Sequence, residues 1–125
     1  MKSKTGKILI IEDEPDVAET MKMLLEREGY AVEYTLDPKK GLGMIKDFDL
    51  LCLDIIMPIM SGREVLVEMV KRKIKVPVIV VSAVGMPIEV ERELTGKFSG
   101  LVVGFVSKPY MHTDLANEVK EHIGK

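Results

Sequence analysis

Residues 51–62 read Leu51-Cys52-Leu53-Asp54-Ile55-Ile56-Met57-Pro58-Ile59-Met60-Ser61-Gly62. The run is apolar apart from Asp54 until it breaks at Pro58 and again at Gly62. An uninterrupted apolar run of a strand's length is typical of a β-strand that is covered on both faces, as in parallel sheets. In open parallel sheets, ligands bind at the carboxyl ends of the strands. The position of Asp54 at such an end therefore predicts a functional carboxylate.

Four more short segments rich in branched apolar residues predict strands on either side of 50–53 in the chain. They are residues 7–11, 31–35, 78–81 and 101–106. The second of them contains Glu33, which indicates that one face or an edge of that strand is exposed. Segments with helical signals alternate with these strands, so the chain repeats a strand and helix unit five times.

Two helices with proline near their first turn are predicted between the first three strands. The first begins around Pro15 and stops at Gly29, a residue that commonly terminates helices. The second has Asp37 as its cap and Pro38 as its first residue, and we expect it to continue to Asp47.

Three further helices are predicted in the second half of the chain. Ser61 and Glu64 fit a capping box at the start of the third helix. The fourth is expected to begin at Met86 or Pro87 and to extend toward Phe98. Apolar residues spaced four apart lie on one face of the last helix: Leu115, Val119 and Ile123.

The alternation predicts an α/β fold, a doubly wound five-stranded parallel sheet with helices on both faces. We expect the flavodoxin-like strand order 2-1-3-4-5, because the second strand is the most polar of the five and suits an edge. The chain of 125 residues is expected to form a single domain over 1–125. Its core is expected at about 7–123, with no output domain.

The composition excludes several classes of protein. With 46% hydrophobic and 30% charged residues, the chain is typical of a soluble globular domain. A net charge of −2 favours no direct nucleic-acid partner and no membrane partner. No apolar run is long enough to span a bilayer and residues 1–6 lack the apolar core of a signal peptide, so we expect a cytoplasmic location. The single cysteine, Cys52, is expected to act as a small buried hydrophobe.

Polar residues end four of the five predicted strands. Glu12 and Asp13 follow the first, Asp54 ends the third, Ser82 the fourth and Lys108 the fifth. The carboxyl ends of parallel strands share one edge of the sheet, so these residues are expected to converge. Three carboxylates so close together repel one another and need a cation. Mg²⁺, with Mn²⁺ as a substitute, is expected because it prefers a few carboxylates and leaves positions to water or phosphate.

A carboxylate beside a divalent ion and an ammonium group is equipped to accept a phosphoryl group. Asp54 is the predicted nucleophile, and Lys108 would offset charge on the transferring oxygens. Ser82 would hydrogen-bond the new phosphoryl oxygens.

This set of residues resembles the receiver domain of response regulators in two-component signalling, and the likeness covers nearly the whole chain. The motifs that carry it are Glu12-Asp13, Asp54-x-x-Met57-Pro58-x-Met60-x-Gly62, Ser82-Ala83 and Lys108-Pro109. Each motif is weak by itself, whereas the set on a five-unit α/β frame is highly specific.

The resemblance implies a metal-dependent phosphoacceptor site. Asp54 would be the phosphoacceptor, and Asp13 and Asp54 would ligate Mg²⁺, with Glu12 helping through water. The backbone carbonyl of Ile56 would be a further ligand. Lys108 would contact the phosphoryl group.

The resemblance also implies a switch and external partners. Ser82 would be the switch hydroxyl, and Phe105 the aromatic residue that follows it as the fourth helix, fifth strand and fifth helix change conformation. The donor would be a phosphohistidine on a histidine kinase or phosphotransfer protein. The chain would act as a regulator, as a monomer or a phosphorylation-dependent dimer, and would catalyse only its own phosphorylation and dephosphorylation.

Simpler interpretations stand beside these. Ser82 as a helix cap, Phe105 as plain core and Lys108 as a solvated loop residue need no phosphoryl chemistry. A receiver-like docking module that is never phosphorylated is the alternative function. A haloacid-dehalogenase-type phosphatase would need a second aspartate two residues after the nucleophile, where this chain has Ile56. The stretch between Ser82 and Lys108 is also longer than is usual in receivers.

Two apolar residues predict a long-lived phosphoaspartate. Ile56 and Val84 lie two positions past Asp54 and Ser82, where the resemblance places residues that tune hydrolysis. Neither side chain can orient an attacking water. Replacing Ile56 with asparagine is therefore expected to accelerate loss of the phosphoryl group, measured as the decay of the phosphorylated species. Equal or slower decay in Ile56→Asn would contradict this account.

Overall fold

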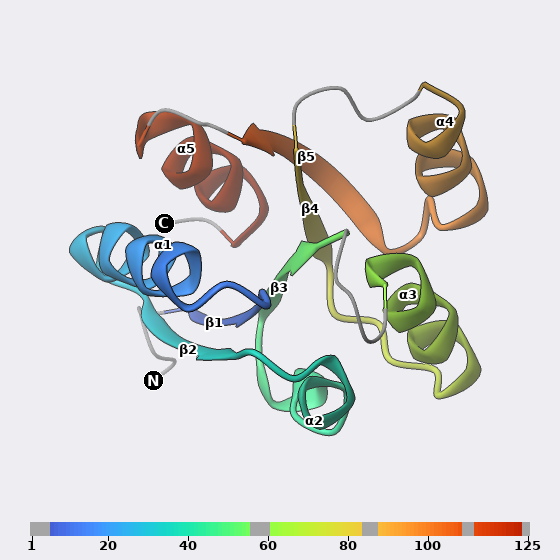
Figure 1. The fold of residues 1–125 in the computed structure, drawn as a ribbon, viewed down its shortest axis with the longest axis horizontal. Helices are drawn as coiled ribbons and strands as arrows, with labels where there is room; N and C mark the ends of the chain where they lie inside the picture. The colour runs from blue at the N-terminus through green and yellow to red at the C-terminus, as the bar shows by residue number, and fades with distance from the viewer. Residues whose placement is uncertain (1–5, 56–60, 84–87, 109–111, 124–125) are drawn as a thin grey trace.

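The computed structural model describes residues 6–55, 61–83, 88–108 and 112–123. Within these ranges five parallel strands form one sheet in the predicted order, β2-β1-β3-β4-β5 (Figure 1). The order places β3 at the centre and β2 and β5 at the edges. The strands span Lys7–Ile11 (β1), Ala31–Thr35 (β2), Leu50–Asp54 (β3), Val78–Ala83 (β4) and Val102–Lys108 (β5).

Helices cover both faces of the sheet, with α1 and α5 on one face and α2, α3 and α4 on the other (Figure 1). Their bounds are Pro15–Arg27 (α1), Pro38–Leu42 (α2), Gly62–Lys71 (α3), Ile88–Lys97 (α4) and His112–Ile123 (α5). The starts predicted for the fourth helix, Met86 and Pro87, lie outside the described residues. In the described ranges, no helix combines the length and the apolar character needed to cross a lipid bilayer.

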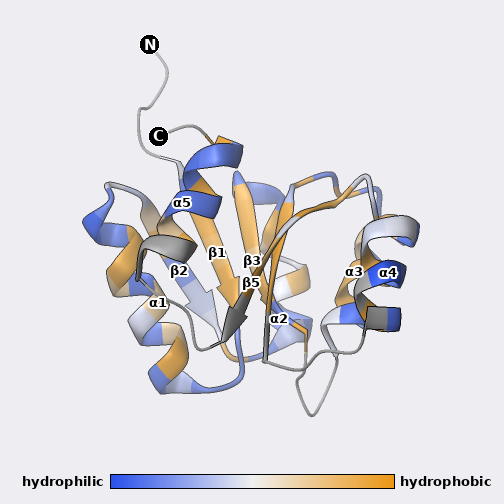
Figure 2. Cartoon of the chain, turned by 90° about the horizontal axis from the view of Figure 1, so that it is seen from above, coloured by the Kyte–Doolittle hydropathy of each residue, from blue (hydrophilic) through white to orange (hydrophobic). Residues whose placement is uncertain are grey.

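β3 is buried along its whole length, which explains why its sequence is apolar up to Asp54 rather than alternating. Leu51 and Leu53 join the apolar cluster beneath α2, α3 and α4, whereas Leu50 and Cys52 join the cluster beneath α1 and α5. Each fully buried leucine contributes roughly 1.5–3 kcal/mol. Figure 2 shows hydrophobic residues along β1 and β3, whereas helices such as α1 carry both hydrophilic and hydrophobic residues.

The polarity of β2 matches its place at the edge of the sheet. Glu33 is exposed, whereas Val32 and Thr35 are buried. An edge strand pairs on one side only and tolerates a charged side chain there. The edge predicted from Glu33 is confirmed.

Side-chain caps begin two helices as predicted. The Asp37 carboxylate accepts a hydrogen bond from the Lys39 N–H at 3.0 Å, at the start of α2. At the start of α3, Ser61 Oγ accepts from the Glu64 N–H at 3.2 Å, and Glu64 Oε1 accepts from the Ser61 N–H at 2.9 Å. This reciprocal pair is the predicted capping box.

The second helix is shorter than predicted. A continuous helix over 37–47 was expected, but α2 ends at Leu42 and a 3-10 helix follows at Ile45–Asp47. Gly41 lowers the helix propensity of this segment, and it lies very close to the sheet. A Cβ at this position would be 2.6 Å from Ile11 Cδ1, so a larger residue here would require the Ile11 side chain to move.

The carboxyl end of α3 closes with a Schellman motif built on a lysine. The Lys73 N–H donates to the Val70 carbonyl at 3.1 Å, and the Ile74 N–H donates to the Met69 carbonyl at 2.9 Å. The motif places Lys73 in the left-handed region, with a φ of 59°. Glycine usually occupies this position, because a Cβ there costs roughly 1–2 kcal/mol.

Replacing Lys73 with glycine is expected to raise the free energy of unfolding by about 1 kcal/mol. Glycine adopts positive φ without the Cβ clash, and its greater freedom in the unfolded chain offsets part of the gain. Urea unfolding measures the effect as a higher midpoint. Lys75→Gly is the matched control, because Lys75 lacks a positive φ and its replacement is expected to lower the midpoint. A midpoint that falls in both variants would show that the left-handed backbone is not strained.

Candidate functional site

Three carboxylates meet at the carboxyl edge of the sheet. Glu12 and Asp13 directly follow β1, and Asp54 is the last residue of β3. The two strands are paired with Ile11 beside Leu53, so the acids leave the sheet at the same level. Carboxylate oxygens of the three residues lie within 4.8 Å of one another. The convergence predicted for these acids is seen in the structure.

This acidic cluster is largely buried, so water solvates its negative charge poorly and a bound cation would stabilise it. Glu12 is 1% exposed and Asp54 5% exposed, and Asp13 is half-buried. Negative charges this close together repel one another, and a positive charge among them relieves the repulsion. The donor set fits a hard divalent ion, because oxygens on opposite sides of Mg²⁺ are about 4.2 Å apart.

Thr35 helps to position Glu12, a role that the sequence analysis missed. The Glu12 N–H donates to the Thr35 carbonyl at 3.2 Å, and the Glu14 N–H donates to Glu12 Oε2 at 3.2 Å. The Thr35 hydroxyl in turn accepts from the Asp37 N–H at 3.2 Å. Because the contact to Glu12 uses the backbone carbonyl of Thr35, the side chains in the sequence do not indicate it.

The ends of β4 and β5 extend the same edge. Ser82 pairs with Ser107, and Ala83 pairs with Lys108, so the backbones of Ser82 and Lys108 lie at the carboxyl ends of their strands. Val81 pairs with Asp54, one residue before Ser82. The structure describes the backbone of Ser82 and Lys108 but not their side chains.

Phe105 lies in β5 beside Val80. Its ring is half-buried and packs against the apolar cluster beneath α2, α3 and α4. The two residues predicted to tune hydrolysis, Ile56 and Val84, lie outside the described residues. The same holds for the predicted metal ligand, the Ile56 carbonyl.

The loop after β3 returns to the sheet at a glycine. The Gly62 N–H donates to the Ile55 carbonyl at 3.0 Å. A Cβ on Gly62 would lie 2.6 Å from the Asp54 carbonyl oxygen and 2.7 Å from Ile55 Cα. Both atoms belong to the backbone and cannot move aside like a flexible side chain, so Gly62 allows α3 to begin directly against the end of β3.

Cys52 is not part of a reactive site. It is fully buried in β3, and burial raises the pKa of its thiol to about 12. The reactive thiolate is therefore suppressed at neutral pH. The expectation that Cys52 acts as a small hydrophobe is in line with this environment.

An ion pair joins α3 to α4. Arg63 Nε and Nη2 both donate to Glu93 Oε2, at 2.9 and 2.7 Å. This hydrogen bond lowers the pKa of the Glu93 carboxyl. Both side chains of this pair remain partly exposed at the surface. The contact spans thirty residues of sequence, and no local pattern indicates it.

Comparison with known proteins identifies relatives along most of the chain. Residues 8–120 match the family model of the response regulator receiver domain. The response regulator GtcR of Aneurinibacillus migulanus is 35% identical over 113 residues, which cover 86% of this chain and 43% of GtcR. The chain spans about half the length of the curated relatives that it matches.

Solved structures share the fold. FixJ-N is similar with a TM-score of 0.81 and 27% identity, covering 98% of this chain and 95% of that one. The signal receiver domain of a putative LuxO repressor protein from Vibrio parahaemolyticus has a TM-score of 0.82 and 23% identity. That match covers 95% of this chain and 90% of the other.

Replacing Gly62 with alanine is expected to lower the free energy of unfolding by about 2 kcal/mol, because the new Cβ overlaps backbone atoms. Urea unfolding at equilibrium measures the change. Gly96→Ala is the matched control, since Gly96 lies in α4 and a Cβ there meets nothing within 4 Å. That variant is expected to gain roughly 0.5–1 kcal/mol. Equal stability of Gly62→Ala and the unmodified protein would contradict the close approach at β3.

Proposed function

Because the chain belongs to the response regulator receiver domain family, we propose that it is a phosphoacceptor switch of a two-component or phosphorelay system. Asp54 receives a phosphoryl group from a phosphohistidine on a partner histidine kinase or phosphotransfer protein. The observation that carries this proposal is the buried Asp54 carboxylate at the end of β3, clustered with Glu12 and Asp13. Residues 7–123 act as one receiver unit.

Mg²⁺ is the proposed cofactor of the acidic cluster. Asp13 and Asp54 would hold it directly, with Glu12 acting through water and the Ile56 carbonyl as a further ligand. When bound, the ion offsets charge that builds up on the transferring phosphoryl oxygens. The buried Glu12 and the half-buried Asp13 supply the negative charge that keeps a divalent cation beside Asp54.

Transfer would proceed at a carboxylate oxygen of Asp54. The bond from this oxygen to phosphorus forms as the partner's nitrogen–phosphorus bond breaks, and the electron pair of that bond stays on the imidazole nitrogen. Lys108, at the end of β5, would place its ammonium beside the phosphoryl group. The product is an acyl phosphate on Asp54 and a free histidine on the donor.

The switch would pass from the site to the face formed by α4, β5 and α5. Ser82 would hydrogen-bond the phosphoryl group, and the ring of Phe105 would follow it. Support comes from the half-burial of Phe105, since a ring that is not fully enclosed can repack with less cost. The changed face would alter affinity for a downstream partner, and phosphorylation would bias the two packings.

Exposure to acetyl phosphate with Mg²⁺ tests the proposal. Intact-protein mass spectrometry is expected to show one added phosphoryl group, absent in Asp54→Asn and absent when EDTA replaces Mg²⁺. Asp16→Asn is the control, because Asp16 is an exposed acid in the first turn of α1 and is expected to leave the adduct unchanged.

Metal binding has a separate readout. Mg²⁺ at a hundredfold excess over its dissociation constant stabilises a folded protein by about 2.7 kcal/mol, so we expect the Tm to rise. The rise is expected to shrink in Asp13→Asn and to persist in Asp16→Asn. A Tm that rises with Mg²⁺ while no donor gives an adduct would instead identify a docking module that is not phosphorylated.

A further inference from the structure

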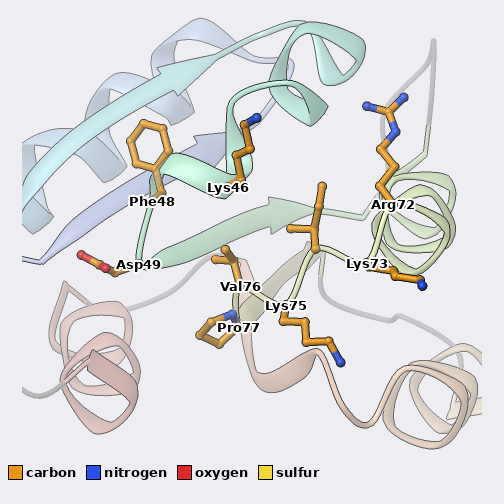
Figure 3. Close-up of a pocket in the computed structure, with 9 residues that line it drawn as sticks. Lys46, Phe48, Asp49, Arg72, Lys73, Lys75, Val76 and Pro77 are labelled. Carbon is orange, nitrogen blue, oxygen red and sulfur yellow. The ribbon is translucent and has the colours of Figure 1, made fainter.

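An open groove of about 470 Å³ lies at the amino edge of the sheet (Figure 3). The acidic cluster lies at the other, carboxyl edge. Two segments form it: residues 46, 48 and 49, which lead into β3, and residues 72–77, which lead from α3 into β4. The strands run from this edge toward the acids, so the two sites are separated by the length of the sheet. None of the groove's lining residues belongs to the acidic cluster.

The rim of the groove is cationic. Four exposed cationic residues line it: Lys46, Arg72, Lys73 and Lys75. Figure 3 draws their side chains as sticks. The only acid in the lining is Asp49. The net charge of the whole chain is −2, so the positive charge here is a local feature.

Neighbouring groups offset only part of this charge. The Asp49 carboxylate accepts a hydrogen bond from the Lys7 backbone N–H at 2.8 Å. Glu68 Oε1 lies 3.4 Å from Arg72 Nε, and Glu68 Oε2 lies 3.7 Å from Lys71 Nζ. Two cations therefore share one carboxylate. No ion pair is recorded among the described residues for the ammonium groups of Lys46, Lys73 and Lys75.

The floor of the groove is apolar. Phe48 is buried, and Ile74, Val76 and Pro77 are half-buried, so each of these three keeps part of its surface open. Ile74 and Val76 pack against the core cluster beneath α2, α3 and α4. A floor that is anchored in the core is preorganised, which lowers the cost of binding.

Lys73 occupies the most strained backbone position of the groove. Its φ of 59° is one that glycine adopts without cost. A lysine here places a charge on the rim at the expense of stability. Strain of this kind is a reason to look for a binding role at the site.

We propose that this groove binds an acidic segment of a partner protein, with glutamate or aspartate side chains on the lysine rim and an aliphatic side chain on the apolar floor. The mixed lining favours a peptide over nucleic acid, because a phosphate backbone has no apolar side chain to place on the floor. The same floor is too small for the broad contact that a membrane surface makes. The groove acts whether or not Asp54 is phosphorylated.

Fluorescence anisotropy with a labelled peptide of alternating glutamate and leucine tests the groove on the full chain. We expect saturable binding that weakens with added salt, and amide NMR shifts that concentrate at Ile74 and Val76. Lys73→Gly is expected to weaken binding roughly two- to fivefold, the range for loss of one exposed ion pair. Lys73→Gly combined with Lys75→Gln is expected to weaken it about tenfold.

Because Lys73→Gly is expected to stabilise the fold, weaker peptide binding by this variant could not be caused by unfolding. The charge-matched control is Lys39→Gln with Lys40→Gln, two exposed lysines of α2 outside the groove, and it is expected to keep the affinity. Equal weakening by this control, or full affinity in the Lys73 and Lys75 variant, would overturn the proposal. So would the absence of saturable binding, or tighter binding of single-stranded DNA or of phosphatidylserine vesicles through the same lysines.

Discussion

Burial of β3 on both faces is the constraint on which the rest of the structure depends. Leu51 and Leu53 require helices on one side of the sheet, and Leu50 and Cys52 require helices on the other. A strand covered in this way must lie in the middle, between β1 and β4. Asp54 is the last residue of this buried central strand, so its carboxylate lies at the carboxyl edge of the sheet.

The parallel arrangement gives the two edges of the sheet different chemistry. Every strand ends at the same edge, where Glu12, Asp13 and Asp54 bring their carboxylates together. At the other edge, the segments that lead into β3 and β4 bring lysines together over an apolar floor. Opposite charge at the two edges lets each edge serve a different kind of partner, a phosphoryl donor in the proposed function and an acidic segment in the proposed groove.

Much of this could be predicted because local signals agreed with the fold. The apolar run of β3, the charge of Glu33 in β2 and the reciprocal cap of Ser61 and Glu64 each depend on neighbours in the sequence. The interruption of the second helix did not follow from such signals. The short α2 places Gly41 against Ile11 of β1, a contact between segments that are distant in the sequence.

The sequence by itself determined the five strand and helix units, the strand order and the identity of the acids, because hydrophobic period and turn residues act over short distances. The tertiary structure decided which groups meet. The link from Arg63 to Glu93, the support of Glu12 by Thr35 and the groove at the amino edge each join segments distant in the chain. Their geometry is set by helix packing on the sheet, which no single segment encodes.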